Sequence, residues 1–282
     1  MKKSQLIYQY IREQGAVSKQ DIVIGLGLSL PTITQNLNNL AELGLIDTSK
    51  KISNTGGRNA TAYSYIEKAR YAVGLYLNRH HINCVAVDLS GNVISLIRVR
   101  ENFDLNDDNY LRKIGETVEE VKKDTGLSDD RFLGVGIAVQ GLISDDGERV
   151  TYGLTLNFTG VTRADIAKYI PYHNRLFHDS AAAGYAEVWD RNDLDDAFYL
   201  SLSNSVGGAV IVANKIFEGE RRKSGEIGHM TIIPKAGDRC YCGQRGCFDT
   251  VCRANVLAEY ADGDLEKFFE LLETKDLGAR RH

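Results

Sequence analysis

Residues 225–230 read GEIGHM and residues 240–249 read CYCGQRGCFD, and these two strings decide how the chain is interpreted. Between them they hold one histidine and three cysteines, the Cys3His donor set of a closed, structural zinc site. Gly243 and Gly246 favour tight turns between the cysteines, because glycine adopts backbone angles that other residues avoid. The sequence therefore predicts one structural Zn2+ per chain, held by His229, Cys240, Cys242 and Cys247.

The alternative is a cysteine-rich loop without metal. A single intracellular cysteine is most often a small buried hydrophobic residue, and the Cys240-x-Cys242 spacing is shorter than the usual gap of roughly two to four residues. Three cysteines in one glycine-rich loop favour the metal. Cys84 and Cys252 stand outside this loop and are predicted to be buried thiols, as expected in a reducing compartment.

The composition indicates a folded cytoplasmic protein. The 282 residues are 43% hydrophobic and 26% charged, which suffices for more than one core. No apolar stretch approaches the ~20 residues that span a bilayer, and residues 1–15 lack the apolar region of a secretory signal. We therefore expect no membrane insertion.

Positive charge is concentrated at the amino end. Residues 1–70 carry nine Lys and Arg against five Asp and Glu, whereas the rest of the chain carries 25 against 33. Lys and Arg neutralise phosphates and supply most non-specific affinity for nucleic acid. A solvated helix face would give the same count, so the charge needs a motif to support it.

A helical motif is present in the same region. Apolar spacing predicts a helix over Ser4–Glu13, a second helix capped by Ser18, and a third capped by Ser29 with Pro31 in its first turn. A short two-stranded hairpin should follow, up to residue 66. The third helix is predicted to turn four residues toward the core: Ile33, Leu37, Leu40 and Leu43.

The outward side of this third helix carries short polar side chains that are suited to base edges in the major groove. They are Thr32, Thr34, Gln35, Asn38 and Asn39. The arrangement resembles a winged helix-turn-helix, with Arg58 at the Gly-Gly-Arg tip of the wing, where arginine suits a narrow A/T-rich minor groove. The alternative for Arg58 is a solvated charge on a hairpin turn. Residues 1–70 are thus predicted to bind DNA.

From residue 71 the pattern changes to alternating strands and helices. Strands are predicted over 72–77, 82–89, 93–100 and 132–139, with a helix over 107–125. Further segments follow at 163–170, 175–178, 180–189 and 197–203. The fold class is α/β.

Taken together, GEIGHM and CYCGQRGCFD are similar to the signature of the ROK family of bacterial sugar kinases and transcriptional repressors. The resemblance implies an actin-like (ribonuclease H-like) fold, with a first lobe over 71–196 and a partial second lobe over 197–282. Val206-Gly207-Gly208-Ala209 would lie on the opening hairpin of that second lobe. It also implies that His229 and the three cysteines hold zinc. Family members continue well beyond the zinc loop, so the chain is expected to be either truncated or natively abbreviated, and truncation would expose apolar surface around residues 256–272.

Carried over residue by residue, the resemblance assigns five sugar contacts: Asn157, Asp179, Glu226, His229 and Asp249. His229 would place one ring nitrogen on zinc and turn the other toward the sugar. His178 stands where the family has Asn, and Asp249 where it usually has Glu. For Asp179 the alternative role is a helix cap.

The kinase chemistry of the family is predicted to be lost. Residues 74–81 read GLYLNRHH in place of the Asp-x-Gly-Gly-Thr turn of the kinases, so bulky side chains replace glycines that approach nucleotide phosphate. The sequence predicts a sugar-responsive repressor that is not an enzyme and binds operator DNA as a homodimer or homotetramer. The alternative is an ATP-dependent sugar kinase with an appended DNA-binding domain, in which Asp179 is the general base. A third interpretation is a protein-docking module, for which no surface stands out.

Overall fold

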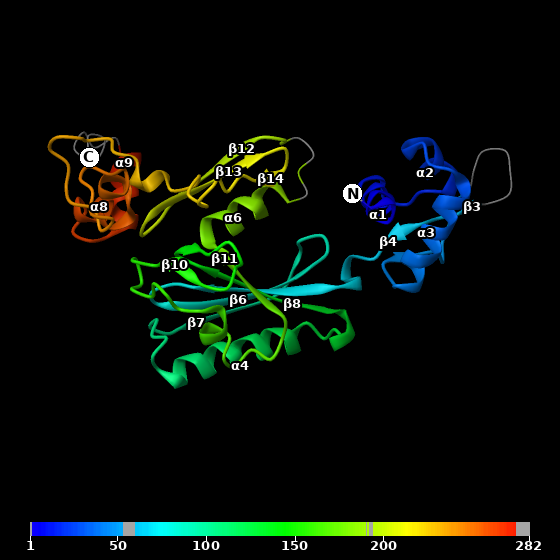
Figure 1. The fold of residues 1–282 in the computed structure, drawn as a ribbon, viewed down its shortest axis with the longest axis horizontal. Coiled ribbons are helices and arrows are strands. Elements are labelled where there is room, and N and C mark those ends of the chain that lie inside the picture. The colour runs from blue at the N-terminus through cyan, green and yellow to red at the C-terminus, as the bar shows by residue number, and fades with distance from the viewer. Residues whose placement is uncertain (1, 53–59, 190, 192–193, 275–282) are drawn as a thin grey trace. The chain divides into compact units, whose positions relative to one another are not determined.

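The computed structural model describes residues 2–52, 60–189, 191 and 194–274. The chain divides into two compact units (Figure 1). The first contains Met1–Tyr71 with the short segments Val87–Asn92 and Leu127–Leu133, and the second contains Ala72–Ala86, Val93–Gly126 and Gly134–His282. None of the described helices is both long and apolar enough to span a membrane.

Three helices form most of the first unit: α1 (Lys3–Gln14), α2 (Lys19–Leu26) and α3 (Leu30–Glu42). Their predicted apolar faces meet in one core, whose buried members include Ile7, Ile11, Ile22, Ile33, Leu37 and Leu40. Isolated helices of this length are marginal in water. Burial of these faces therefore stabilises the three helices.

The prediction for the first serine cap is confirmed. Ser18 Oγ accepts the amide of Asp21 at 3.2 Å, and Asp21 Oδ2 accepts the amide of Ser18 at 2.8 Å. Ser29 stands at the N-cap of α3, but its side chain makes no cap bond to the helix. Its hydroxyl pairs with Thr32 Oγ1 at 2.9 Å instead.

The prediction that Leu43 lies in the core is wrong. Leu43 is 48% exposed, because it lies at the C-cap of α3 and the next residue reverses the chain. Gly44 has φ 65°, a left-handed angle that favours glycine. Ile46, just beyond this turn, is buried in the same core.

Two short antiparallel pairs follow α3. β1 (Ile46–Asp47) pairs with β4 (Ser64–Tyr65), and β2 (Lys51–Ile52) pairs with β3 (Ala60–Thr61). Arg58 and the two glycines before it lie outside the described residues.

A five-stranded sheet follows, with the order β11-β8-β5-β6-β7. The predicted strands are confirmed: β5 (Tyr71–Leu77), β6 (His81–Asp88), β7 (Val93–Arg100), β8 (Phe132–Val139) and β11 (Asn174–His178). α4 (Asp108–Asp124) runs along one face of this sheet (Figure 1), with Leu111, Ile114, Val118 and Val121 buried. β11 lies parallel to β8 and pairs His178 with Val139, which brings His178 to the carboxyl end of the sheet.

Shorter elements precede or follow these strands along the chain. They are η1 (Glu67–Ala69), η2 (Asp129–Arg131), β9 (Leu142–Ile143), β10 (Val150–Tyr152) and α5 (Arg163–Ile166). β9 and β10 pair antiparallel, and the loop after β10 leads to α5.

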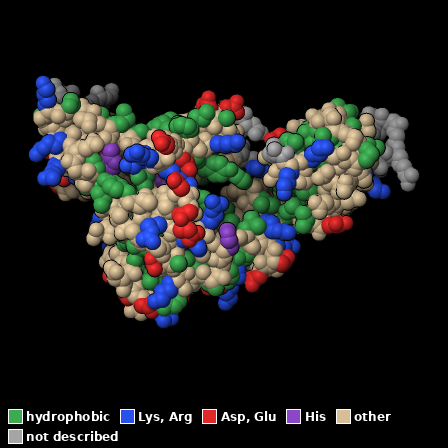
Figure 2. Space-filling view, in the orientation of Figure 1, with side chains coloured by type: hydrophobic (Ala, Val, Ile, Leu, Met, Phe, Trp, Pro, Cys, Tyr) green, Lys and Arg blue, Asp and Glu red, His purple; other side chains and the backbone are tan. Residues whose placement is uncertain are grey.

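A second, three-stranded sheet has the order β12-β13-β14 and contains β12 (Ala197–Leu202), β13 (Val206–Val212) and β14 (Lys215–Ile216). α6 (Asp179–Val188) packs on it at Gly184, where an added Cβ would lie 2.8 Å from the Cβ of Ala209. The predicted hairpin at residues 206–209 is confirmed. β12 forms one edge of this sheet, with Phe198, Leu200 and Leu202 exposed, and hydrophobic side chains lie at the surface in this region (Figure 2).

The last described elements are η3 (Ile227–His229), α7 (Asp249–Cys252), α8 (Ala254–Glu259) and α9 (Leu265–Glu273). α8 and α9 enclose a small core around Ala261 and Phe268, to which Leu257, Leu271 and Leu272 contribute. Apolar exposure in this region is confined mainly to Tyr260 and Phe269. Cys84 is fully buried as predicted, whereas Cys252 is only half-buried.

Candidate functional site

The four predicted metal donors lie together. His229 Nδ1 is 3.6 Å from Cys240 Sγ, Cys242 Sγ is 3.7 Å from Cys247 Sγ, and all four donor atoms lie within 4.8 Å of one another. Bond lengths of about 2.3 Å to sulfur and about 2.0 Å to nitrogen give a tetrahedral zinc site edges of roughly 3.8 Å (S to S) and 3.5 Å (S to N). The donor set therefore fits a tetrahedral divalent ion.

The loop backbone explains why glycines separate these donors. The Cys240 amide donates to Gln244 O at 2.8 Å, and the Gly243 amide donates to Cys240 O at 3.0 Å, so the loop turns back on itself. Gly243 has φ 93°. At Gly246, with φ 69°, an added Cβ would collide with the carbonyl of Ile233.

Two of the thiols, Cys240 and Cys247, hold their protons more strongly than a free cysteine does. Burial raises the pKa of Cys240, and burial together with the neighbouring thiols raises the pKa of Cys247 to about 12. Thiolates are nevertheless the form that binds metal. A divalent cation at the centre of the cluster would offset the buried negative charge, so its binding would release protons.

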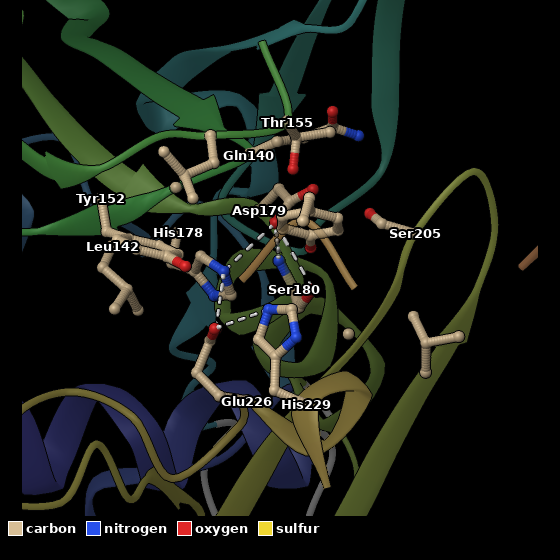
Figure 3. A pocket seen from close by; sticks show the side chains of 15 residues that line it. Gln140, Leu142, Tyr152, Thr155, His178, Asp179, Ser180, Ser205, Glu226 and His229 are labelled. Atoms are coloured by element: carbon tan, nitrogen blue, oxygen red, sulfur yellow. Dashed lines mark hydrogen bonds and ion pairs between the residues drawn. The ribbon is translucent and has the colours of Figure 1, made fainter. Parts of the chain in front are cut away.

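A polar cavity lies beside the cluster, and Figure 3 shows the side chains that line it. His178 Nε2 lies 3.6 Å from Asp179 Oδ1 and 3.7 Å from Glu226 Oε1. His229 Nε2 lies 3.8 Å from Glu226 Oε2. The Glu226 carboxylate thus stands between two imidazole rings at the cavity wall.

Two glycines fix the positions of Glu226 and His229. Gly225 lies so close to β13 that an added Cβ would collide with the carbonyl of Gly208, and Gly228 would likewise collide with the carbonyl of Val206. Both glycines of the GEIGH string therefore allow η3 to approach β13. This approach places Glu226 and His229 against the cavity.

His229 belongs both to the Cys3His cluster and to the cavity wall. Its Nδ1 faces Cys240 while its Nε2 faces Glu226. A metal ion on Nδ1 would leave Nε2 as the protonated nitrogen, able to donate to Glu226 or to a ligand.

Asp179 has features of both roles that the sequence predicted for it, a sugar contact and a helix cap. It lines the cavity, and its Oδ1 accepts the amide of Ser180 at 2.7 Å. It is nevertheless the first residue of α6, and His178 occupies the N-cap. Burial raises the pKa of Asp179, and His178 opposes this shift.

Tyr76 lies in β5, within residues 74–81, the segment that differs from the Asp-x-Gly-Gly-Thr turn of the kinases. Gln140 Nε2 donates to the Tyr76 hydroxyl at 3.1 Å. Burial, and then the nearby charge of Asp179, raise the pKa of Tyr76 to about 12. Asp179 therefore has a neutral phenol as its neighbour.

Two assigned sugar contacts do not line the cavity. Asn157 is exposed, with φ 55°, whereas Thr155 in the same loop lines the wall. Asp249 is fully buried: its Oδ1 accepts the amide of Val206 at 2.7 Å, and its Oδ2 lies 3.9 Å from Arg253 Nη1. Asp249 therefore supports the start of β13 from behind the cavity wall.

Sequence reasoning missed several lining residues: Gln140, Tyr152, Thr155 and Tyr241. One of them had a usable signal. Tyr241 stands between two metal donors, so it must lie near any cavity that His229 lines. The others are on loops or strand ends whose direction the sequence pattern does not define.

In the first unit, the predicted base-reading residues fall into two groups. Gln35, Asn38 and Asn39 are exposed on α3. Thr32 and Thr34 are half-buried, and the hydroxyl of Thr32 is already paired with Ser29. Of the predicted base-reading side chains on α3, the three amides are therefore more exposed than the two hydroxyls.

The second unit thus combines two β-sheets with a Cys3His cluster beside a cavity lined by carboxylate and imidazole groups. Residues 72–278 match the model of the ROK family, and the chain belongs to this family. It is 25% identical over 258 residues to the xylose repressor of Bacillus subtilis and 24% identical over 278 residues to the DNA-binding transcriptional dual regulator NagC of Escherichia coli. These matches cover 89% and 91% of the chain but only 66% and 63% of the relatives.

Solved structures have a similar fold. A ROK family transcriptional regulator, described as a homolog of the E. coli MLC protein, matches 92% of the chain and 66% of its own length with a TM-score of 0.74 and 22% identity. A ROK hexokinase from Thermus thermophilus matches 75% of the chain and 72% of its own length, with a TM-score of 0.59 and 25% identity. The fold is therefore common to regulators and kinases.

Proposed function

We propose that this chain is the DNA-binding and effector-binding part of a sugar-responsive transcriptional repressor. A relative named a xylose repressor and one named a DNA-binding transcriptional dual regulator match 89% and 91% of the chain. The observation that carries the proposal is the position of Glu226, between His178 and His229, with the other nitrogen of His229 at the thiol cluster. The His229 imidazole, held in place by a metal ion, and the carboxylates of Asp179 and Glu226 would form a binding site for a polyhydroxylated ligand.

The ligand chemistry follows from the polarity of these groups. Carboxylates accept strong hydrogen bonds from hydroxyls, and an imidazole N–H donates to a hydroxyl oxygen. Asp179, Glu226 and His229 would together bind a sugar. A structural Zn2+ on His229, Cys240, Cys242 and Cys247 would hold His229 in place.

DNA binding is assigned to α1–α3 and the strand pairs after them, as a winged helix-turn-helix. Glutamine and asparagine amides suit the N6 and N7 edge of adenine, so the exposed Gln35, Asn38 and Asn39 favour a half-site that contains adenine. Arg58 would contact an A/T-rich minor groove from the wing. A homodimer or homotetramer in the cytoplasm would present two such modules to paired half-sites.

Phosphoryl transfer is not part of the proposal. Tyr76 and Arg79 put bulky side chains into the segment where the kinases of the family have glycines and a carboxylate. The competing function, an ATP-dependent sugar kinase, draws support from the fold that the chain shares with the hexokinase. Formation of ADP and a sugar phosphate from ATP and a sugar with Mg2+, abolished in Asp179→Asn, would establish the kinase and overturn the repressor.

The repressor is tested directly with DNA. An operator is selected from random duplexes with the full chain, and xylose, N-acetylglucosamine and glucose are titrated against the complex. Effector coupling of this kind is typically about 1–3 kcal/mol, or roughly 5- to 150-fold in DNA affinity. Absence of sequence-selective DNA binding, or a bound sugar that leaves DNA affinity unchanged, would reject the proposal.

A further inference from the structure

A second cavity adjoins the polar cavity beside the thiol cluster. It lies between β9, β11, α6, the β13–β14 hairpin and the loop that leads to η3, all within the second unit. Its volume is about 250 Å³, whereas the first cavity has about 50 Å³. Leu142, His178 and Glu226 line both cavities, and Figure 3 shows them on the side of the first cavity opposite Ser205. The two cavities therefore share a wall, in which His178 Nε2 lies 3.7 Å from Glu226 Oε1.

The inner wall of the second cavity is apolar. It is formed by the buried side chains of Ile143, Leu176 and Ala209 and by the half-buried Ile216. β11 is an edge strand, so side chains from both of its faces border the cavity. A mainly apolar wall with a few polar groups at fixed positions is typical of small-molecule sites. The second cavity therefore offers a surface for the nonpolar face of a ligand.

Polar groups line the rim of this cavity, where Arg222 is held in one position. Its Nη2 donates to Asp145 O at 3.1 Å, and its Nε lies 3.5 Å from Asp145 Oδ1 and 3.4 Å from Glu218 Oε2. Arg222 also has φ 52°, a left-handed angle that a residue other than glycine keeps only where its surroundings impose it. Because two carboxylates already face this guanidinium, the rim suits hydroxyl groups better than an anion.

Arg175 and Phe177 line the same cavity from β11. They are two residues apart on a strand and therefore lie on one face of it. The Arg175 guanidinium carbon lies 6.0 Å from the centre of the Phe177 ring, and both side chains are exposed. A guanidinium donates hydrogen bonds to hydroxyl oxygens, and the face of an aromatic ring gives apolar contact. Together they match the two kinds of surface, hydroxyl and C–H, that a sugar ring presents.

We infer that the two cavities form one bipartite site and that the effector is a glycoside with at least two rings, such as a disaccharide. The inference rests on the proposed sugar-binding function. Small-molecule sites have volumes from about 300 Å³ upward. The first cavity alone is far below this size, and the two together reach it. One ring meets Asp179, Glu226 and His229, and the second ring, joined to the first past Leu142, occupies the second cavity.

The test compares single rings with paired rings of the same sugar. Isothermal titration of the zinc-loaded full chain uses xylose against xylobiose, N-acetylglucosamine against N,N′-diacetylchitobiose, and glucose against both cellobiose and maltose. At least one disaccharide should bind roughly 10-fold more tightly than its own monosaccharide, the gain expected from one or two added hydrogen bonds. Comparison within each pair removes the preference of the site for a particular sugar.

Ala181→Leu places a larger apolar side chain in the second cavity, since Ala181 lines that cavity and not the first. It should lower the affinity for the tighter disaccharide to that of the monosaccharide, while the monosaccharide binds as it does to wild type. Ala186→Leu makes the same change at an exposed position of α6 outside both cavities. This control should leave both affinities unchanged.

Arg175→Ala removes a donor from the second cavity without filling it. Affinity for the disaccharide should fall roughly 3- to 10-fold, the range expected for one hydrogen bond, and affinity for the monosaccharide should not change. Arg100→Ala is the control, because Arg100 is an exposed arginine at the end of β7 outside both cavities. Since Arg175 is itself exposed, Arg175→Ala should keep the unfolding midpoint and zinc content of wild type even if Ala181→Leu does not.

Equal affinities for every disaccharide and its monosaccharide would overturn the inference while the proposed function stands. A disaccharide gain that survives both Ala181→Leu and Arg175→Ala would also overturn it, because the second ring would then lie elsewhere. If no sugar of either kind bound, both the function and the inference would be rejected.

Discussion

His229 turns Nδ1 to Cys240, 3.6 Å away, while its Nε2 lies 3.8 Å from Glu226 Oε2. One ring thus belongs to the thiol cluster and to the cavity wall at once. Any change at the metal would alter the ring that the ligand meets, and any ligand on Nε2 would bear on the cluster. The first two predictions separate these two sides of the ring.

On the cluster side, Cys240→Ser should lower zinc from about one ion per chain to near zero. The unfolding midpoint should fall too, because a closed structural site contributes to folding free energy. Elemental analysis and thermal unfolding measure both. Cys252→Ser makes the same chemical change at a half-buried thiol outside the cluster and should keep the metal. A fully zinc-loaded Cys240→Ser protein would contradict the assignment.

On the cavity side, Glu226→Gln preserves size and removes charge. Sugar affinity should fall roughly 10- to 100-fold, as expected when a charged hydrogen-bond acceptor becomes neutral. Titration calorimetry measures it, and zinc content should not change. Glu220→Gln, at an exposed position in the preceding loop, is the matched control. Equal affinity in the two variants would exclude Glu226 as a sugar contact.

Asp179→Asn should stabilise the unliganded protein at neutral pH. Burial raises the pKa of Asp179 above its unfolded value, so the ionised carboxylate lowers stability once the pH rises through the folded pKa. Asparagine never ionises. The gain should be largest near pH 7 and shrink as the pH falls and the wild-type carboxyl becomes protonated.

Thermal unfolding between pH 4 and 8 measures this effect, with a midpoint rise of about 2–4 °C for each kcal/mol gained. Sugar affinity should fall in the same variant, because a ligand acceptor is lost. A lower midpoint for Asp179→Asn at pH 7 would show that the charge is stabilising and contradict the prediction.

Asp249→Ala should destabilise the fold by about 1–3 kcal/mol, because it leaves the buried amide of Val206 without an acceptor. Asp249→Asn retains an oxygen acceptor and should lose less. Denaturant unfolding measures both. If Asp249 only supports β13, Asp249→Asn keeps sugar affinity within about threefold, less than one lost hydrogen bond. A larger loss would make Asp249 a sugar contact, as the family resemblance implies.

Asn38→Ala should weaken binding to a selected operator and relax the preference at one base pair, since a bidentate amide–adenine pair contributes about 1–3 kcal/mol. Fluorescence anisotropy at fixed salt measures the loss. Asn106→Ala, on an exposed loop of the second unit, should bind like wild type. Unchanged base preference in Asn38→Ala would remove α3 from base reading.

Much of the fold is predictable because its signals are local. Apolar spacing located the helices that became α1, α3 and α4, and β-rich runs located β5 to β8 within a residue or two. Leu43 was misplaced because the periodicity continues past the point where Gly44 turns the chain. A helical pattern does not show where the backbone leaves the helix.

The candidate site was predictable where one short segment carries it. The donor set His229, Cys240, Cys242 and Cys247 follows from the sequence alone, since metal chemistry restricts residue type and the loop is short. Asn157 and Asp249 lie elsewhere because a side chain's direction depends on contacts far along the chain. The Thr155 carbonyl accepts a hydrogen bond from Arg79, and the Asp249 carboxylate accepts the amide of Val206.

The sequence by itself determined the family, the element order and the residues of the Cys3His cluster, because each is fixed by residue type and spacing along the chain. Only the tertiary structure decided which nitrogen of His229 faces the thiols, which residue of the 153–160 loop meets the cavity, and that Glu226 stands between two imidazoles. Those relationships depend on the close packing of Gly225 and Gly228 against β13, which no local pattern encodes.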